Sequence, residues 1–352
     1  MRAGHSRWTA GLALSLLVVL GLSACSDDKK ETTESGSTTT AAPTGSPSVS
    51  VTMTEYAFNV SGPLTAGGTV KLANQGKEFH MAFLTKLKEG KTLADVQNML
   101  EQQSEGGEEQ SSTTEGQSST TEGQSSTTSG RTSTTAASAG QGEEQQGEEQ
   151  QGDPFSEIGD PVGPPGGFMG PGQTADVTVP NLTEGTYAMM CFLPTEGEGT
   201  PHFAKGMVNQ LQVTAGTAPP APTADATYKV APGKAVEGPT TLTAGNHTLK
   251  FEAAAGSEQL EPALAKLNPG TTMAELEEAG DKLFAEGSGP PPKNAASQLP
   301  GAILYGSIDL GSTTTFYVSA NFTAGTWAID AADTDAENRP KPPKETIEIK
   351  VT

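Results

Sequence analysis

Short stretches of this chain alternate between apolar and polar residues, which is the pattern of β-strands with one buried face. The alternation over 49–53 continues over 56–60 in the opposite phase. Because a slip of one residue moves the apolar set to the other face, the sequence predicts a β-bulge near Thr54 or Glu55. Turns of Gly, Pro and Asn separate further expected strands around Val70 and Leu72 and over 175–179, 185–193 and 207–213.

Two segments show helical spacing instead. Thr92 is followed three residues later by Asp95, and Thr272 by Glu275, each before apolar residues at helical spacing. A threonine with an acidic residue at this distance caps the start of a helix. We therefore expect one short helix after Thr92 and another after Thr272.

The two expected helices belong to two copies of one longer pattern. Residues 181–189 (NLTEGTYAM) match 321–329 (NFTAGTWAI), and 64–67 match 242–245 as LTAG in both places. Order and spacing agree between the copies apart from one polar tract in the first.

The repeat divides the chain into two homologous domains, expected at 48–216 and 225–352. A Pro/Ala segment at 217–224 is the expected linker between them. Short, evenly spaced strands with a single short helix in each copy indicate an all-β fold of two tandem Greek-key β-sandwiches.

Two polar tracts lack the apolar residues of a packed core. Residues 25–47, rich in Ser, Thr and Gly, are expected to form a flexible tether. Residues 101–152 repeat EGQSSTT at 115–121 and 122–128 and hold ten Glu and one Arg. Because this Gln/Ser/Thr/Glu composition cannot repay the entropy of ordering, a disordered insertion within the first domain is expected.

Residues 1–24 have the features of an export signal. Arg2 and Arg7 precede an apolar run at 12–20 that is short for a bilayer span. The run leads to Leu-Ser-Ala-Cys ending at Cys25, which resembles the lipobox of bacterial lipoproteins. The resemblance implies a lipid on the sulfur of Cys25 and a mature protein anchored to the cell membrane on its extracytoplasmic side. The alternative is an ordinary signal peptide with an incidental cysteine.

The charge balance bears on the choice of partners. The 352 residues carry a formal net charge of −21, and without residues 1–24 the balance is 19 basic to 42 acidic residues. A surface this acidic repels nucleic acid, which is not expected as a partner. A protein partner is expected to present a basic face.

Four side chains carry the candidate chemistry: His80, Cys191, His202 and Met207. The chain has only four His and two Cys, and His5 and Cys25 lie in or directly after the export signal. A thiolate, two imidazoles and a thioether form the donor set of a His2Cys copper site with a long bond to Met. Zinc also accepts His2Cys, but Met is a poor zinc ligand. The alternative is a buried structural cysteine, although exported proteins seldom leave a thiol unoccupied.

This donor set resembles that of the cupredoxin, or blue-copper, superfamily, which includes plastocyanin and azurin. Residues 74–80 (NQGKEFH) resemble the turn that presents the upstream histidine in that family. Cys191, His202 and Met207 resemble the ligands from its last two strands and their loop, although the Cys-to-His interval is longer than in plastocyanin. The resemblance implies one type 1 copper centre that transfers single electrons.

A shell of apolar side chains is expected to exclude water from the metal. Its candidates, each equally consistent with ordinary sandwich core, are Phe79, Phe83, Met189, Phe192 and Phe203. Pro201 and Gly206 are expected to stiffen and turn the ligand loop.

The second copy has lost the ligands. Alignment of the repeat places these residues opposite the four ligands in chain order: Leu260 or Glu261, Ala331, Pro340 and Glu345. A structural or docking module is therefore expected. His247, beside Asn246 in a turn, is expected to be a solvated loop residue.

The first functional hypothesis is a membrane-tethered type 1 copper protein that transfers electrons in the cell envelope to a redox partner. The alternatives are a copper storage, delivery or resistance lipoprotein with a copper-exchange partner, and a metal-free binding or scaffold lipoprotein. An enzyme is not expected, because only three His follow Cys25, too few for the further copper centres of multicopper oxidases and nitrite reductases. No phosphate-binding loop or Ser-His-Asp set can be built either.

Overall fold

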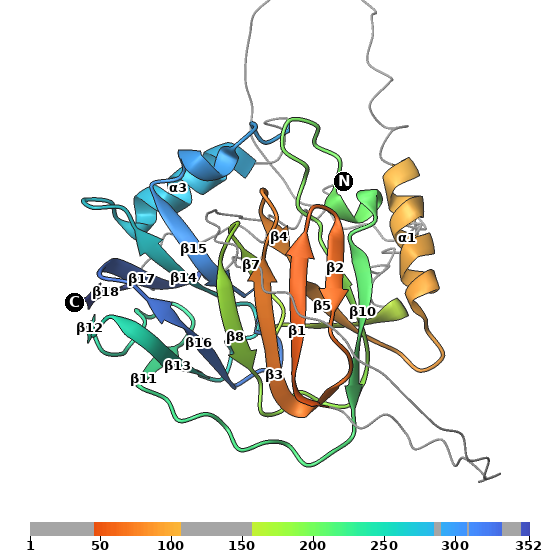
Figure 1. The fold of residues 1–352 in the computed structure, drawn as a ribbon, viewed down its shortest axis with the longest axis horizontal. Coiled ribbons are helices and arrows are strands. Elements are labelled where there is room, and N and C mark those ends of the chain that lie inside the picture. The colour runs from red at the N-terminus through yellow and green to blue at the C-terminus, as the bar shows by residue number, and fades with distance from the viewer. Residues whose placement is uncertain (1–45, 107–156, 285–289, 308–309, 333–345) are drawn as a thin grey trace, which may run out of the picture.

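The computed structural model describes residues 46–106, 157–284, 290–307, 310–332 and 346–352. These residues form β-strands and two helices, α1 (Leu93–Gly106) and α3 (Met273–Phe284), as Figure 1 shows. The all-β fold expected from the sequence is confirmed. The predicted export signal, Cys25 and most of the predicted tether and insertion lie outside the described residues, whereas residues 46–47, predicted as the end of the tether, begin a strand.

The strands of the first copy are β1 (Ser46–Thr54), β2 (Ala57–Val60), β3 (Leu64–Asn74), β4 (His80–Met81), β5 (Phe83–Leu87), β6 (Gly159–Val162), β7 (Phe168–Met169), β8 (Thr174–Thr178), β9 (Gly185–Met190) and β10 (Val208–Thr214). Those of the second copy are β11 (Ala226–Val230), β12 (Thr241–Leu242), β13 (Gly245–Ala253), β14 (Glu261–Leu267), β15 (Gly301–Gly306), β16 (Thr315–Phe322), β17 (Gly325–Ala332) and β18 (Ile347–Val351). Two short 3-10 helices, η2 (His202–Lys205) and η3 (Ala295–Gln298), complete the described elements.

Both copies have the same strand topology. In the first, β9 pairs with β5 and β10, and the start of β3 runs parallel to β10. In the second, β17 pairs with β14 and β18, and β12 runs parallel to β18. The second layer of the first copy contains β1, which runs parallel to β3. The second layer of the second copy contains β11, which runs parallel to β13. Each copy is therefore a two-layer β-sandwich, as predicted.

The repeated sequence motif forms the same local structure in both copies. The Tyr187 hydroxyl donates a hydrogen bond to the carbonyl oxygen of Thr183 over 2.8 Å, and Trp327 Nε1 donates to the carbonyl of Thr323 over 2.8 Å. Each bond satisfies the polar end of a buried aromatic side chain. The match of 181–189 with 321–329 therefore extends from sequence to hydrogen bonding.

The sheets of the two copies are continuous with each other, which tandem sandwiches do not require. Strand β8 pairs antiparallel with its own counterpart β16, and β7 pairs with β15. Val177 lies opposite Val318, and Thr178 opposite Tyr317, so each residue faces the repeat counterpart of its neighbour. This reciprocal pairing is that of a two-fold symmetric dimer built within one chain.

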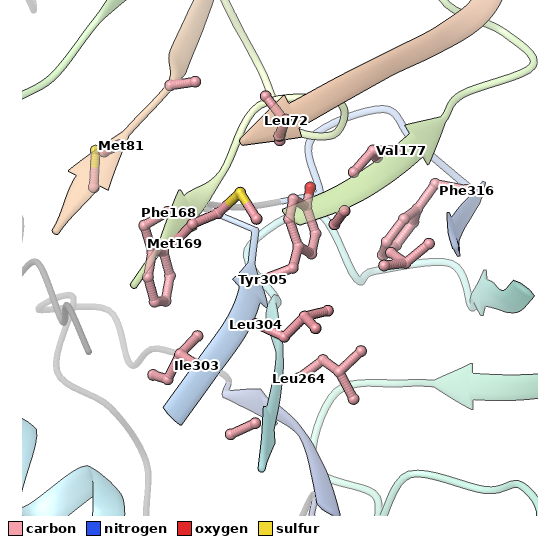
Figure 2. Close-up of a cluster of buried hydrophobic side chains, with 14 of the residues drawn as sticks. Leu72, Met81, Phe168, Met169, Val177, Leu264, Ile303, Leu304, Tyr305 and Phe316 are labelled. Atoms are coloured by element: carbon pink, nitrogen blue, oxygen red, sulfur yellow. The ribbon is translucent and has the colours of Figure 1, made fainter. Parts of the chain in front are cut away.

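One hydrophobic core spans both copies. Figure 2 shows side chains of the first copy (Leu72, Met81, Phe168, Met169 and Val177) packed with those of the second (Leu264, Ile303, Leu304, Tyr305 and Phe316). The Tyr305 hydroxyl donates to the carbonyl oxygen of Gly166 over 2.8 Å, from one copy to the other. The two copies are therefore packed as one unit.

The predicted β-bulge near Thr54 or Glu55 is wrong. The chain reverses there instead: Thr54 pairs with Ala57, which makes Glu55 and Tyr56 a two-residue hairpin turn, and Tyr56 has a φ of 64°. Residues paired across a hairpin face the same side of the sheet, so the apolar phase changes between β1 and β2 without a bulge. The register irregularity of β1 lies between Ser46 and Ser48.

Both predicted helices are present, and their caps form as expected. The carboxylate of Asp95 accepts from Thr92 N over 2.7 Å, and that of Glu275 accepts from Thr272 N over 2.8 Å. Helix α1 continues to Gly106, into the segment from 101 that was predicted as insertion. None of the helices among the described residues is both long and apolar enough to cross a membrane.

Candidate metal centre

The structure brings together three of the four predicted donors. Nδ1 of His80 lies 3.2 Å from Nδ1 of His202, and Sγ of Cys191 lies 3.3 Å from the same His202 atom. All three donor atoms lie within 4.8 Å of one another, and the three side chains are fully buried. In the part of the chain that the structure describes, this is the single group of three or more His, Cys, Asp or Glu side chains close enough to share a metal ion.

The two downstream donors are fixed by the end of β9 and the loop to β10. Cys191 directly follows β9, and its N–H donates to the carbonyl of Met207 over 3.2 Å. Met207 N donates in turn to the carbonyl of His202 over 3.0 Å. Gly206 closes the short helix η2 with a φ of 101°, a conformation that favours glycine. The loop backbone thus places Cys191, His202 and Met207 side by side.

Met207 is fully buried and directly precedes β10. Its backbone is hydrogen-bonded to the backbones of Cys191 and His202. Its thioether remains a predicted ligand.

The upstream donor is positioned by the buried side chain of Asn74. Its Oδ1 accepts from Gly76 N over 2.9 Å, and its Nδ2 donates to the carbonyls of Glu78 and Met169 over 2.9 and 3.0 Å. These bonds shape the turn before β4, which begins at His80. An Asx turn of this kind is the expected use of Asn before a strand.

Burial sets the protonation of the donors in the absence of a cation. Burial, and then the proximity of His202, lowers the pKa of His80 to about 3, so its imidazole is neutral and keeps a lone pair for a ligand. Burial raises the pKa of Cys191 to about 12, against hydrogen bonds from the backbone of Met81 and Leu193 that favour the thiolate. Metal binding must therefore release the thiol proton, and the two N–H donors are in place to stabilise the resulting thiolate.

A carboxylate that sequence reasoning missed completes the surroundings of His202. Glu78 Oε2 lies 3.0 Å from His202 Nε2 and accepts from Glu196 N over 3.0 Å. Although burial alone would raise the pKa of Glu78, the hydrogen bond with His202 and the backbone bond lower it. The signal available in the sequence was an acidic residue two positions before a ligand, which the fold brings next to the other histidine.

The predicted apolar shell divides into two groups. Phe79 and Met189 belong to the main core. Phe83, Phe192 and Phe203 stack edge to face, with ring centroids 5.4 Å apart in each pair, against the cluster that α1 covers. Two of these three directly follow a ligand in the sequence, so they cover the outside of the ligand strands.

The absence of a side chain at Gly76 is required by His80. A Cβ at this position would lie 2.4 Å from His80 Nε2, an atom that is buried and has no hydrogen-bond partner. The backbone of Gly76 is outside the left-handed region, so alanine adds a clash but no backbone strain.

Gly76→Ala is therefore expected to displace the His80 ring and weaken copper binding by about 10-fold or more, the size seen when the support of a metal ligand is lost. Competition with a Cu(I) or Cu(II) chelator measures the effect. The free energy of unfolding of the metal-free protein should fall by only about 1–3 kcal/mol, the cost of local overpacking. Unchanged copper affinity would show that His80 does not need this space.

The second copy carries none of the ligand types at the corresponding positions that the structure describes. Leu260 and Ala331 are both buried, and Glu261, the other residue aligned with His80, is half-buried. Pro340 and Glu345 lie outside the described residues. His247 is not the solvated residue that was expected: its side chain is only 14% exposed, and its Nε2 lies 2.7 Å from the carbonyl of Thr243.

Next to Ala331, the second copy holds the buried carboxyl group of Asp330 beside that of the half-buried Glu277. Burial, the charge of Asp330 and a hydrogen bond with it raise the pKa of Glu277 far above its ordinary range, and Asp281 adds to this shift. Asp330 also accepts from Thr346 Oγ1 over 2.9 Å. Glu277 therefore keeps its proton to a higher pH than an exposed glutamate does.

A raised carboxyl pKa means that the folded state binds more protons than the unfolded state above the ordinary Glu pKa of about 4.3. The stability from this pair is complete below that pH and is lost as the pH rises. We expect Glu277→Gln to raise the free energy of unfolding by about 1–4 kcal/mol more at pH 8 than at pH 5. Urea unfolding of both proteins at the two pH values measures this difference, and parallel pH profiles would contradict the raised pKa of Glu277.

The donor chemistry fits copper. Two imidazoles and a cysteine sulfur beside a buried thioether are soft or borderline donors, the kind that copper prefers. Asp and Glu, which suit harder cations, supply none of the three clustered donor atoms. The donor set therefore suits copper, in agreement with the sequence-based expectation.

Among solved structures, this chain is similar to blue copper proteins and copper enzymes. A dithionite-reduced auracyanin from Roseiflexus castenholzii matches with 15% identity and a TM-score of 0.25, covering 49% of this chain and 99% of that chain. Auracyanin A from Chloroflexus aurantiacus, a blue copper protein, matches with 20% identity and a TM-score of 0.24, covering 36% and 98%. A copper nitrite reductase from Nitrosomonas europaea matches with 11% identity and a TM-score of 0.21, covering 87% and 93%.

No protein-family model matches the chain, and no curated protein matches it significantly. Copper as the metal follows from the chemistry of the donor atoms. The first copy is a two-layer sandwich whose clustered donors lie after an upstream turn, directly after β9 and in the loop before β10, which agrees with the cupredoxin-like arrangement expected from the sequence.

Proposed function

We propose that the protein binds one copper ion through His80, Cys191, His202 and Met207 and transfers single electrons. The convergence of two Nδ1 atoms and one Sγ atom in a fully buried pocket supports this proposal most strongly. When bound, copper supplies a one-electron couple between Cu(II) and Cu(I).

Rigidity and burial favour electron transfer over copper delivery. The three downstream donors are held by backbone hydrogen bonds of 3.0 to 3.2 Å, and the upstream donor follows a turn fixed by Asn74. Donor atoms fixed in this way move little when the metal changes its charge, which favours fast electron transfer. Copper delivery instead calls for a ligand that an acceptor protein can reach, whereas these donors are buried.

The proposal includes a lipid anchor at Cys25 on the extracytoplasmic face of the membrane and a protein partner with a basic face. The lipobox-like sequence before Cys25 supports the anchor, and the formal net charge of −21 supports the partner's charge. We propose no catalytic role, because the three histidines after Cys25 allow one copper centre only, whereas copper enzymes with this type of fold use several.

The decisive experiment is to add Cu(II) to the protein lacking residues 1–25 and to record its visible spectrum and reversible voltammetry. The proposal expects one intense thiolate-to-copper band per molecule, full bleaching by a mild reductant and recovery on oxidation without metal loss. Rapid transfer of Cu(I) to an acceptor chelator, without a stable coloured state, would favour copper delivery. Failure to bind copper would favour the third hypothesis, a metal-free binding or scaffold protein.

A further inference from the structure

Glu78 connects the metal centre to the second copy. Its Oε2 lies 3.0 Å from His202 Nε2, on the side of the ring opposite the donor atom Nδ1. Its other oxygen accepts from the Tyr56 hydroxyl over 3.4 Å, and the Tyr56 ring packs edge-on against His202. The side chain of Glu78 is 15% exposed and that of His202 only 1%, so Glu78 takes the place of solvent at this edge.

The same carboxylate is fixed from the second copy. Glu196 N donates to Glu78 Oε2 over 3.0 Å, and the carboxylate of Glu196 accepts from Asn294 N over 2.6 Å. Gly197 N, the next residue of the ligand loop, donates to the carbonyl of Pro291 over 2.6 Å. The ligand loop between Cys191 and His202 therefore rests on the segment before η3.

The upstream ligand depends on the second copy as well. His80 lies in β4, which pairs with β7, and β7 pairs with β15 of the second copy. The second copy thus contacts both histidine ligands indirectly. It connects to His80 through the pairing of β15, β7 and β4, and to His202 through Glu196 and Glu78.

We propose that Glu78 is a positioning residue of the metal centre and that the second copy holds it in place through Glu196. By accepting the Nε2 proton of His202, Glu78 selects the tautomer whose Nδ1 lone pair faces Cys191 and His80. The second copy, without ligands of its own, then acts as the support that sets how firmly copper is held. The predicted change in copper release rests on the proposed copper function, whereas the predicted change in the His202 tautomer can be measured without metal.

The test compares Glu78→Leu, which removes the acceptor, with Glu78→Gln, whose amide oxygen can still accept from His202 and Glu196. Nitrogen-15 NMR of the metal-free protein reports the His202 tautomer, and stopped-flow chelator competition reports the copper release rate. In Glu78→Leu we expect a mixed tautomer and about 10- to 100-fold faster release, the usual effect of losing a partner behind a ligand. Glu78→Gln should keep the wild-type tautomer and release copper within a few-fold of wild type. Glu196→Ala should change both readouts in the same direction as Glu78→Leu, by less.

Glu89→Leu, at an exposed position, is the matched control and should behave as wild type. Circular dichroism establishes that each variant is folded before comparison. A wild-type tautomer and release rate in Glu78→Leu would overturn the positioning role, as would equal defects in Glu78→Gln and Glu78→Leu, because charge alone would then explain the effect. A wild-type Glu196→Ala would remove the second copy from the proposal. If the wild type does not bind copper, the proposed function is disproved, but the result on the His202 tautomer remains valid.

Discussion

Cys191→Ser is expected to abolish the intense visible band of the copper-loaded protein and to weaken copper binding by several orders of magnitude. The band arises from charge transfer between thiolate sulfur and Cu(II), and Cys191 Sγ is the thiol sulfur of the donor cluster. Serine is nearly isosteric, but its hydroxyl is a hard and far less acidic donor that copper ligates poorly. Absorption spectroscopy during Cu(II) titration, with isothermal calorimetry for affinity, measures both effects.

The chain offers a matched control in its other cysteine. Cys25→Ser, made in a protein that keeps residue 25, is the same chemical change outside the described residues, so it should leave the band and the affinity unchanged. The metal-free Cys191→Ser protein should unfold at nearly the wild-type denaturant concentration, because serine fills almost the same volume. A band that persists in Cys191→Ser would disprove the assignment of Cys191 as the copper ligand.

Tyr305→Ala is expected to destabilise the whole protein, including the copy that carries the metal centre, by about 3–5 kcal/mol. The ring is buried in the core that both copies share, and its hydroxyl donates to Gly166 of the first copy. The substitution leaves a cavity and an unsatisfied carbonyl at the point where β7 meets β15. Because typical domains are stable by only 5–15 kcal/mol, this loss is a large share of the total.

Urea unfolding with two signals checks this prediction. Trp327 follows the second copy by fluorescence, since the chain's other tryptophan, Trp8, lies in the predicted export signal. The copper band follows the first copy. Both signals should change together in the wild type and shift together in Tyr305→Ala, while Tyr305→Phe, which keeps the ring, should cost about 1–3 kcal/mol. A first copy whose transition stays in place in Tyr305→Ala would show that the copies fold independently.

Local features of the fold were predictable from the sequence. Both helices begin at the threonine caps, and the strands follow the alternation of apolar residues, because these patterns act over a few neighbouring positions. The turn at Glu55 and Tyr56 was misread as a bulge, since a change of phase looks the same for a bulge and for a two-residue hairpin. The pairing of β8 with β16 could not be predicted, because a strand's periodicity shows which face is buried but not which strand lies beside it.

The donors of the metal centre could be predicted from the sequence for a different reason. Imidazole, thiol and thioether groups are so scarce in this chain that their chemistry singles them out, even though His80 and Cys191 are far apart in sequence. Glu78 and Glu196, in contrast, are two of many acidic residues. Their role depends on their positions in the folded chain: Glu78 lies beside His202, and Glu196 contacts the second copy. The composition of the chain does not show these positions.

The strand pairing between the two copies has a consequence for behaviour at low abundance. A pair of separate molecules joined edge to edge dissociates on dilution, whereas β8 and β16 lie on one chain and meet at the same effective concentration however scarce the protein is. Each of these strands also covers the other's exposed amide and carbonyl groups, so neither offers a template to a neighbouring molecule. The duplication thereby keeps the edges of β8 and β16 paired within one chain at any protein concentration.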